Sequence, residues 1–238
     1  MKNLLIIGAG GYGREVLNWV LDHSRNNLDW KVGGFLDSRS SALDGFATES
    51  QGLPNAVPYL PEVHKHFSRA FGIVGDPMTY IPGPEDVFLC ALGDPAERRR
   101  YAKPILDKGG YFMVLVHPHA LVSTFSTLGR GSIIGPFASV SPDAHIGEFV
   151  TVNSYTGIAH DARIGDWCEI DGHCLIAGRA QIGTGARIHG GAVITPDARV
   201  GDEAVVGAGS VVFGRVPAGV TVIGNPAKRL NWKESAVP

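Results

Sequence analysis

The sequence predicts a two-part chain, a small α/β domain followed by an all-β domain whose short strands wind into a parallel β-helix. Two observations carry this prediction. A glycine-rich turn, Gly8 to Gly13, follows an apolar stretch near the N-terminus. From Val116 to Val212 an aliphatic residue recurs at every sixth position. We therefore expect one domain over residues 1–112 and a second over residues 113–238, the latter including a C-terminal loop and tail.

The first domain is expected to open with a buried strand at Leu4–Ile7, an uninterrupted aliphatic run. A helix should follow the glycine turn, from Arg14 to about His23. Val32–Leu36 and Val87–Leu92 predict two further strands, the first of them ending at Asp37. A strand, glycine turn, helix and strand in this order indicate a βαβ unit with a parallel sheet.

The glycine turn admits three interpretations. Gly8, Gly10 and Gly13, with Asp37 beyond them, match a dinucleotide-binding pattern, in which glycines let backbone N–H groups approach a phosphate at a helix N-terminus. The pattern fits a nucleotide or nucleotide-sugar phosphate site, a nicotinamide cofactor, or a turn that only packs helix against strand. Residues 45–84 are an excursion interrupted by Pro and Gly, and no second mononucleotide-binding half follows. This weighs against the nicotinamide cofactor.

The second domain shows two inward-facing positions in each six-residue repeat. One position holds Leu, Ile or Val throughout, at Val116, Val122, Leu128, Ile134, Val140, Ile146, Val152, Ile158, Ile164, Ile170, Ile176, Ile182, Ile188, Ile194, Val200, Val206 and Val212. Four residues after each anchor from Leu128 onward stands a small or slender side chain. These are Ser132, Ala138, Ala144, Val150, Thr156, Ala162, Cys168, Cys174, Ala180, Ala186, Ala192, Ala198, Ala204 and Ser210.

A period of six fits neither an α-helix nor a simple strand alternation. It fits a triangular coil of three short strands, in which the anchors of stacked coils form a continuous aliphatic column. Eighteen residues per coil predict about five coils between residues 116 and 211. We expect the glycines that often follow the anchors to serve tight corners. Cys168 and Cys174, at small inward positions, are interpreted as core thiols.

Composition excludes several classes of protein. There are 21 Lys and Arg against 23 Asp and Glu, a net charge of −2, which argues against nucleic-acid or membrane-surface binding through a basic patch. No apolar run approaches the roughly 18 residues of a membrane span, and Leu4–Ile7 is too short for a signal-peptide core. Three cysteines without a CxxC pair indicate neither a disulfide framework nor a cysteine zinc site. We expect a cytoplasmic protein.

The chain resembles the NeuD/PglD-type sugar acyltransferases, and the resemblance covers nearly its whole length. The residues that carry it are Gly8-Ala9-Gly10-Gly11-Tyr12-Gly13, Phe35-Leu36-Asp37, Ala91-Leu92-Gly93-Asp94, His117-Pro118, Asn153, His160-Asp161, Ala177-Gly178 and Gly224-Asn225-Pro226-Ala227-Lys228-Arg229. The resemblance implies a Rossmann-like nucleotide-sugar-binding domain followed by a left-handed β-helix of hexapeptide repeats. It also implies acetyl transfer from acetyl-CoA to a sugar amine or hydroxyl, without a metal, in homotrimers with active sites between adjacent β-helices.

The resemblance assigns the catalytic groups to the β-helix. His160 matches the general base of the family, and Asp161 matches the acidic residue beside it. Asn153 matches an asparagine of the catalytic cleft. Glu169 stands where many members carry a second histidine, and we expect it to bind substrate. The stretch around Asp171 also departs from the usual family sequence.

The resemblance also assigns two binding regions. The residues expected to contact acetyl-CoA are Ala177, Gly178, Pro226, Lys228 and Arg229, with the Gly178 N–H at the thioester carbonyl. The residues expected to contact the phosphates of a nucleotide-linked sugar are Gly8, Gly10, Gly11, Tyr12 and Gly13, and those expected at its base or ribose are Asp37 and Ser38.

The chemistry suits these residue types. Acyl transfer from a thioester needs a base for the acceptor's proton and donors for the developing oxyanion. Imidazole has a pKa near the working pH, and a neighbouring carboxylate orients the ring and stabilises its protonated form. His160 lies two residues after the inward anchor Ile158 and is therefore expected to project outward.

Non-catalytic interpretations stay open at several positions. His160 is alternatively a solvated histidine, Asp161 a corner residue and Glu169 an exposed charge. Other residues with such an interpretation are Lys228 and Arg229 (a solvated pair), His117 and His119 (a structural junction) and Arg98 to Arg100 (the solvated start of a helix). His160, His173 and His189 would form the ligands of a zinc hydratase, although their spacing gives no compact ligand motif.

The leading hypothesis is an acetyl-CoA-dependent N-acetyltransferase acting on a nucleotide-linked amino sugar for a bacterial surface glycan. The alternatives are a sialic-acid-type sugar O-acetyltransferase, a non-catalytic trimeric nucleotide-binding scaffold, a zinc hydratase and a dehydrogenase. No nucleic-acid or membrane partner is expected.

Overall fold

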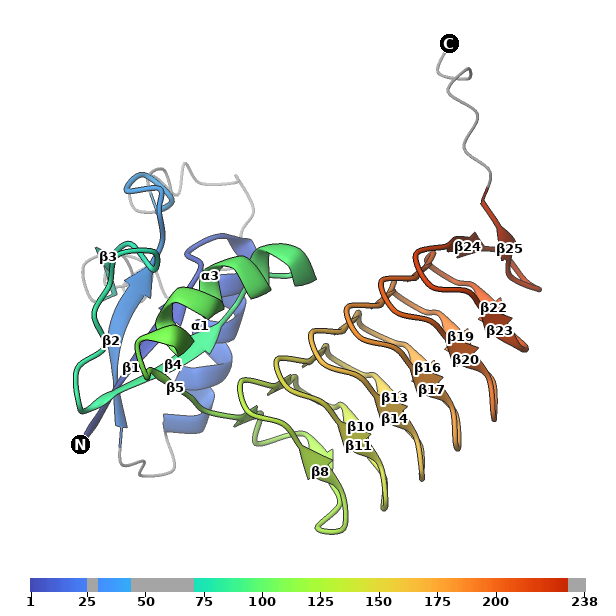
Figure 1. Ribbon diagram of the computed structural model, residues 1–238. Coiled ribbons are helices and arrows are strands. Elements are labelled where there is room, and N and C mark those ends of the chain that lie inside the picture. Colours follow the sequence, from blue (N-terminus) through green and yellow to red (C-terminus); the bar gives the residue numbers. More distant parts are fainter. Residues whose placement is uncertain (25–29, 44–70, 231–238) are drawn as a thin grey trace, which may run out of the picture. The chain divides into compact units, whose positions relative to one another are not determined.

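The computed structural model describes residues 1–24, 30–43 and 71–230, which form two compact units (Figure 1). One unit comprises Met1–Leu92 and Glu97–Met113, and the other comprises Gly93–Ala96 and Val114–Pro238. Within the described residues, no helix has both the length and the apolar character needed to cross a bilayer.

The first unit contains a five-stranded parallel sheet with the strand order β3-β2-β1-β4-β5. The elements up to residue 112 are β1 (Lys2–Ile7), α1 (Gly11–Ser24), β2 (Trp30–Leu36), β3 (Ile73–Gly75), β4 (Asp86–Cys90), α3 (Pro95–Asp107) and β5 (Tyr111–Phe112). The order reverses between β1 and β4, and in open α/β sheets ligands bind beyond the carboxyl ends of the strands at such a point. The turn after β1 lies there.

Apolar side chains explain this sheet. Leu4, Leu5, Ile6 and Ile7 are all buried, because the strand is covered on both faces, as parallel strands are. In α1 the buried side chains Val16, Leu17 and Val20 follow the helical spacing of three and four residues. The Rossmann-like prediction is thus confirmed.

The structure corrects details of this half. α1 begins at Gly11 rather than at Arg14, and β3 lies inside the predicted excursion as an edge strand paired with β2. Most of that excursion, residues 44–70, lies outside the described residues. The helix predicted around Arg98 exists, but Arg98 is not solvated: its side chain is buried and its Nε donates to the Leu92 carbonyl at 2.8 Å.

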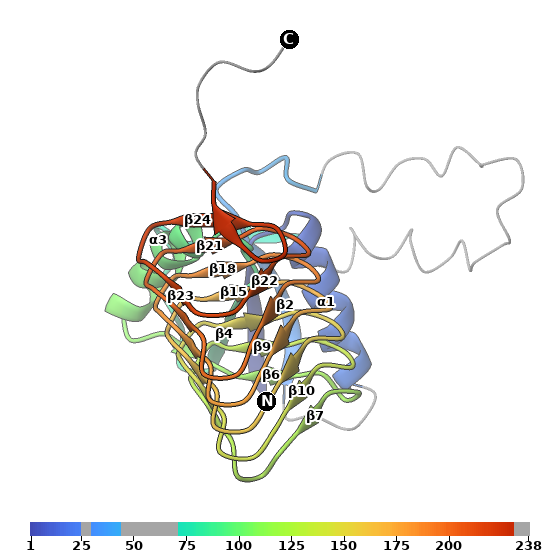
Figure 2. The same cartoon turned by 90° about the vertical axis from the view of Figure 1, so that its right-hand side faces the viewer.

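The second unit is a left-handed parallel β-helix with three flat faces (Figure 2). The first face holds β6 (Leu115–Val116), β9 (Ile133–Ile134), β12 (Thr151–Val152), β15 (Glu169–Ile170), β18 (Arg187–Ile188), β21 (Val205–Val206), β24 (Thr221–Ile223) and β25 (Lys228–Arg229). The second face holds β7 (Leu121–Val122), β10 (Ser139–Val140), β13 (Gly157–Ile158), β16 (Leu175–Ile176), β19 (Val193–Ile194) and β22 (Val211–Val212). The third face holds β8 (Thr127–Leu128), β11 (His145–Ile146), β14 (Arg163–Ile164), β17 (Gln181–Ile182), β20 (Arg199–Val200) and β23 (Arg215–Val216).

The six-residue anchors form the predicted core. Those from Ile134 onward are buried, and the small residues between them are buried as well. Cys168 and Cys174 belong to this core, and burial raises the pKa of the Cys174 thiol to about 11. The interpretation as core thiols is confirmed, because a thiol held neutral in an apolar column is a poor nucleophile.

The β-helix is longer than the five coils predicted. The second and third faces each have six strands, and the first face continues to β24. The strict period ends at Val212, so the sequence pattern missed the final coil. That coil is shorter: Val200 pairs with Val216 and Val206 with Val222, instead of with residues 18 positions on.

The corners differ from the prediction in their use of glycine. The left-handed backbone falls three residues after an anchor and is mostly taken by other residues, among them Phe137 (φ 59°) and Asp161 (φ 60°). Glycines directly after the anchors lack this conformation and serve close packing between coils instead. A Cβ on Gly165, for example, would lie 2.8 Å from the Thr184 nitrogen of the next coil.

Candidate functional site

His160 and Asp161 lie at the corner between the second and third faces, between β13 and β14. The His160 Nδ1 and the Asp161 Oδ2 are 2.8 Å apart, and the two side chains are 58% and 55% exposed. A carboxylate on Nδ1 fixes the ring so that Nε2 points away from it, free to exchange a proton with another molecule. The predicted outward projection of His160 is observed.

Gly178 lies one coil further on, against the His160 ring. A Cβ on Gly178 would be 2.9 Å from both Cε1 and Nε2 of that ring, so only glycine leaves the imidazole its position. The Arg179 N–H donates to the His160 carbonyl at 3.1 Å, which fixes the two coils together here. Within the described chain no acceptor faces the Gly178 N–H, whereas the N–H of Ala177 is committed to the Ile194 carbonyl. The structure therefore assembles His160, Asp161 and Gly178.

Asn153 and Glu169 form a separate pair near the corner between the first and second faces. The Asn153 Nδ2 donates to the Glu169 Oε1 at 3.0 Å. Glu169 is buried, which overturns its interpretation as an exposed charge. The pair sits across the second face from His160, since β13 separates the two corners. One copy of the chain therefore holds these candidate residues in two places.

A second imidazole–carboxylate pair escaped the sequence analysis. The His189 Nδ1 lies 3.0 Å from the Asp171 Oδ2, at the same corner as Asn153. His173 stacks on Tyr155 instead, with ring centroids 5.0 Å apart. His160, His173 and His189 thus have three different sets of contacts, and the described residues contain no group of three or more possible ligands around a metal position. Asp171 and His189 are 18 residues apart, the length of one coil, and this spacing could have indicated from the sequence that the two side chains lie next to each other.

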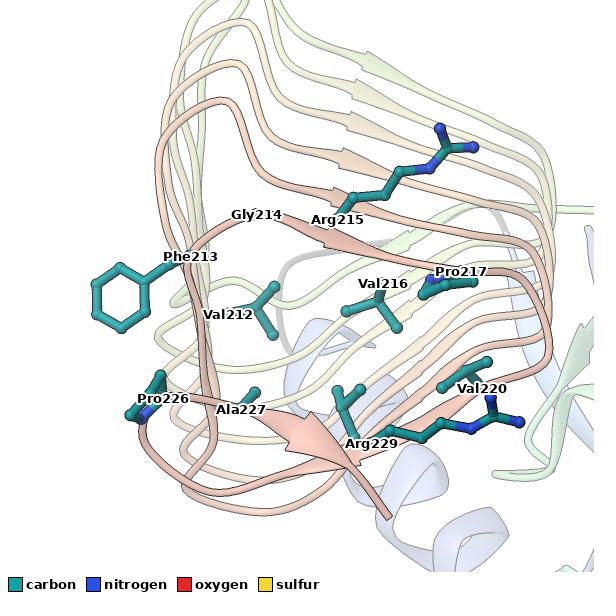
Figure 3. A pocket seen from close by; sticks show the side chains of 11 residues that line it. Val212, Phe213, Gly214, Arg215, Val216, Pro217, Val220, Pro226, Ala227 and Arg229 are labelled. Atoms are coloured by element: carbon teal, nitrogen blue, oxygen red, sulfur yellow. The ribbon is translucent and has the colours of Figure 1, made fainter. Parts of the chain in front are cut away.

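The C-terminal loop borders a cavity of about 370 Å³ at the last coil (Figure 3). Pro226 and Arg229 line the cavity, together with Phe213, which follows β22, and Arg215, which lies on β23. Val212 and Val216 form part of its apolar wall. Lys228 is exposed on β25 and does not line the cavity.

In the first unit, two glycines of the turn serve the fold itself. Gly8 has a left-handed backbone, φ 96°, and a Cβ there would be 2.9 Å from the Ala91 carbonyl oxygen. A Cβ on Gly13 would overlap the carbonyl oxygen of Gly8. The interpretation of the turn as helix-to-strand packing therefore accounts for Gly8 and Gly13.

Gly10 and Gly11 differ from Gly8 and Gly13, because no contact among the described residues requires a glycine at either position. Neither has a left-handed backbone, and the nearest atoms to a Cβ on them are guanidinium nitrogens of Arg39 and Arg14, each at 3.9 Å. Chain neighbours and the backbone of α1 aside, no backbone atom and no other side chain of the described residues comes within 4 Å of either position. Tyr12, between them and Gly13, packs edge-on against Trp19 with ring centroids 6.0 Å apart.

Asp37 holds the turn in place. Asp37 is only 8% exposed, and its carboxylate accepts the Ala9 N–H at 2.9 Å and the Arg39 side chain at 3.1 and 3.2 Å. Burial alone would raise the pKa of Asp37, but the hydrogen bonds from Arg39 and Ala9 outweigh it and hold the pKa below its ordinary value. Ser38 is exposed, and its Oγ lies 3.4 Å from the Tyr101 hydroxyl.

Comparison with known proteins agrees with both halves. Residues 3–79 match the PglD N-terminal domain, and residues 114–216 match the GMPPB C-terminal domain. The acetyltransferase domain of PglB from Neisseria gonorrhoeae FA1090 is 26% identical; the match covers 97% of this chain and 100% of that one, with a TM-score of 0.78. Both halves of the chain are thus similar to proteins of the NeuD/PglD type.

Other proteins similar to this chain were solved with ligands. The same N. gonorrhoeae domain in complex with acetyl coenzyme A is 27% identical over 96% of this chain and 99% of that one, TM-score 0.78. PerB from Caulobacter crescentus, in complex with CoA and GDP-perosamine, is 25% identical over 97% of this chain and 98% of that one, TM-score 0.79. A curated relative, the UDP-N-acetylbacillosamine N-acetyltransferase of Bacillus subtilis (strain 168), is 28% identical over 134 residues, 56% of this chain. The match spans about half of that relative's length, 51%.

Proposed function

We propose that this NeuD/PglD-type protein is an acetyl-CoA-dependent N-acetyltransferase acting on a nucleotide-linked amino sugar, in the formation of a bacterial surface glycan. The observation that carries the proposal is the His160–Asp161 pair beside Gly178, with its 2.8 Å hydrogen bond and exposed His160 side chain. The choice of substrates is supported by the similar structures of perosamine N-acetyltransferase with CoA and GDP-perosamine and by the curated N-acetyltransferase of Bacillus subtilis.

In the proposed reaction His160 is the general base and no covalent enzyme intermediate forms. The sugar amine attacks the thioester carbonyl carbon, and Nε2 of His160 takes the proton that the amine loses. The tetrahedral intermediate collapses by breaking the C–S bond, and the CoA thiolate leaves with the proton returned from the imidazolium. Asp161, on Nδ1, stabilises that imidazolium. The products are an N-acetylated sugar and CoA.

The Gly178 N–H is the group we assign to the thioester oxygen. It lies beside the base, and no acceptor within the described chain engages it. A preorganised backbone donor at the developing oxyanion lowers the barrier without reorganising during the reaction. Glycine is required here because any Cβ would displace the imidazole.

The β-helix also offers groups for the phosphates of CoA. Arg215 and Arg229 are among the residues that line the cavity at the last coil. In Figure 3 the Arg215 side chain and the exposed Phe213 ring point outward from the coil. Guanidinium groups bind phosphate with paired hydrogen bonds, and the apolar wall suits a ring or the pantetheine arm. We assign Pro226 and Arg229 to this site, with Lys228 at its edge.

The active form is proposed to be a homotrimer. The outward positions on the second face carry no charge: they are Leu121, Ser139, Gly157, Leu175, Val193 and Val211. Those on the third face are polar or cationic: Thr127, His145, Arg163, Gln181, Arg199 and Arg215. The exposed rings of Phe137 and Tyr155 border the second face, and large exposed apolar surfaces mark interfaces.

Because Asn153 and His160 lie at opposite edges of the second face, packing through this face brings the two parts of the candidate site together from different copies. Light scattering at micromolar concentration should give three times the monomer mass. A monomeric mass in an active preparation would contradict the shared site.

The reaction itself is tested by incubating the protein and acetyl-CoA with nucleotide 4-amino sugars and, separately, with sialic acids, and following thiol release. Turnover only with the amino sugars supports N-acetylation. Turnover only with sialic acids would identify the alternative, a sialic-acid-type O-acetyltransferase. A third possibility, a non-catalytic scaffold, predicts no thermal shift with acetyl-CoA. We place the reaction in the cytoplasm, since all three cysteines are free and buried, as in a reducing compartment.

A further inference from the structure

Asp161, Arg179 and Asp197 occupy the same corner position in three successive coils. All three have a left-handed backbone, with φ values of 60°, 62° and 63°. The strands on either side of this corner pair in parallel from coil to coil, so the three side chains leave equivalent points of the stack. Neighbouring parallel strands lie about 4.8 Å apart. Arg179 therefore stands one coil away from a carboxylate on either side.

Arg179 engages one of these two carboxylates. Its Nε donates to the Asp197 Oδ1 and its Nη2 to the Asp197 Oδ2, both at 2.8 Å, which makes the pair bidentate. Asp161 pairs instead with the His160 Nδ1, at 2.8 Å. Asp197 raises the pKa of Arg179 through its hydrogen bond and its charge, and the charge of Asp161 raises it as well. The guanidinium thus lies within electrostatic reach of both carboxylates.

Stability is a weak reason for this ion pair. The Arg179 and Asp197 side chains are 54% and 64% exposed, and pairs as exposed as this are screened by solvent. The place of the pair is more informative. The Arg179 N–H donates to the His160 carbonyl at 3.1 Å, so the backbone of Arg179 lies against that of the histidine. If Asp197 did not hold the guanidinium, Asp161 would be the next carboxylate along this corner.

We propose that Asp197 is a positioning residue: it holds the Arg179 guanidinium and so keeps it away from Asp161. The Asp161 carboxylate is thereby left to the His160 ring. The inference rests on the proposed function, in which His160 is the base. While Asp161 accepts the proton on Nδ1, Nε2 is the nitrogen that takes the proton of the amine. If Arg179 turned to Asp161, the tautomer with its proton on Nε2, which is no base at that atom, would gain population.

Two single variants break the same ion pair but leave different groups behind. Asp197→Asn leaves the guanidinium in place without its carboxylate, whereas Arg179→Gln removes the guanidinium itself. In the double variant Arg179→Gln/Asp197→Asn nothing is left to compete for Asp161. Asparagine accepts the left-handed backbone of this corner, so the substitution at Asp197 keeps the local fold.

The first readout is kcat in the thiol-release assay on the full chain. Asp197→Asn should lower kcat about 5-fold, the most that one exposed ion pair contributes, and less than Asp161→Asn does. Arg179→Gln and the double variant should stay within about twofold of wild type, because Asp161 keeps its pairing with His160. A merely structural role of the ion pair predicts equal losses in both single variants and no recovery in the double variant.

The second readout is the tautomer of the His160 ring, which needs no turnover. Nitrogen NMR chemical shifts, recorded at a pH where the imidazole is neutral and assigned with His160→Gln, report which ring nitrogen carries the proton. We expect the proton on Nδ1 in the wild type and in the double variant, and a shift towards Nε2 in Asp197→Asn. Glu148→Gln breaks the exposed Arg130–Glu148 pair, 2.9 Å long, at the corner between the third and first faces. It is the matched control and should change neither readout.

An unchanged tautomer or an unchanged kcat in Asp197→Asn would overturn the proposal. A wild-type ring protonated on Nε2 would do so too, as would a loss of kcat that the double variant does not restore. Failure of the proposed function looks different. If the wild type acetylates no nucleotide amino sugar, the proposed function fails, whereas the tautomer measurement still decides whether Asp197 sets the partner of Asp161.

Discussion

The candidate functional residues of the two units are recognised by different features of the structure. In the β-helix the inward positions repeat from coil to coil, and the functional residues lie among the outward and corner positions, where the residue changes from one coil to the next. His160 occupies a corner position that holds Pro142 in the coil before and Gly178 in the coil after. The α/β unit has no repeat, and its candidate binding positions are indicated instead by glycines that have room for a side chain. Gly10 and Gly11 have no packing reason to be glycine.

This difference has a physical origin. A repetitive coil is stabilised by its column of anchors, so an outward corner residue is free to change without cost to the core. In the α/β unit the turn that binds a ligand also joins β1 to α1, so the same short segment must satisfy both the fold and the ligand. Substitutions in the two units should therefore have different consequences for stability and activity.

The largest expected effect is on catalysis in the β-helix. His160→Ala should lower kcat by roughly 10²- to 10⁴-fold, the usual contribution of a positioned general base, and leave the melting temperature unchanged. The KM for acetyl-CoA should change little. The loss should shrink as pH rises if the acceptor is an amine, because more of it then arrives deprotonated. Steady-state kinetics over a pH series measures both.

The matched control for this prediction is His145→Ala. His145 is an exposed histidine on the third face, hydrogen-bonded at 2.8 Å to Thr127. It should behave as wild type. If His160→Ala retained more than about a tenth of the wild-type kcat, the general-base assignment would be abandoned, since that loss is smaller than a base contributes.

The next effect separates the glycines of the turn. Gly11→Val should weaken nucleotide-sugar binding at least 10-fold while acetyl-CoA affinity and folding are unchanged, because only the ligand's space is filled. Gly13→Val should instead destabilise the first unit by several kcal/mol, on the order of overpacking a core, since its Cβ would overlap the Gly8 carbonyl oxygen. Calorimetric binding and thermal unfolding of both variants test the contrast. Loss of folding in Gly11→Val would contradict it.

A smaller effect is expected at Asp161. Asp161→Asn keeps a hydrogen-bonding group beside the His160 Nδ1 but removes the charge that stabilises the imidazolium. We expect kcat to fall about 10-fold, less than in His160→Ala, because the base itself remains. The same thiol-release assay measures this. A loss as large as that of His160→Ala would show that the two side chains act as one inseparable unit.

The smallest effect concerns Asp37 and stability. The pKa of Asp37 is lowered in the folded protein, so its contribution is present at pH values above the ordinary value of 3.8 and is lost as the pH falls below it. Asp37→Asn should therefore cost about 1 kcal/mol at pH 7, the worth of a hydrogen bond, and less at pH 3. Urea unfolding at the two pH values tests this. An equal deficit at both would assign the effect to packing rather than to charge.

Sequence reasoning worked best where residues recur. The anchors from Val116 to Val212 predicted the β-helix and its buried cysteines, and the spacing around Ile158 correctly predicted that His160 projects outward. It failed where the period changes: only four positions separate Val212 from Val216, so the six-residue series breaks before the coil that ends at Val222. It also missed β3, because three residues beyond a turn-rich stretch pair with β2 only through tertiary contacts.

The candidate site was predictable only in part. His160 and Asp161 are adjacent in sequence, so their pairing needed no knowledge of the fold. The burial of Glu169 and its hydrogen bond to Asn153 depend on how the coils stack, and so does the pairing of Asp171 with His189 one coil further on. The arginines over the glycine turn could not be predicted, because Arg39 is placed by its hydrogen bonds to Asp37 and not by any sequence spacing.

The reversal of β25 has a consequence for how the protein behaves at high concentration. A parallel β-helix has no natural end, since the last coil offers the same strand edges as every other, and a second molecule stacking there would begin a filament. Here β25 turns back antiparallel to β24 on the first face, and its two residues are the exposed cations Lys228 and Arg229. A parallel strand from another molecule meets a reversed, charged edge instead of a continuation of the stack. The same short strand that borders the proposed coenzyme site thus covers the end of the first face, where β24 would otherwise offer a free parallel edge.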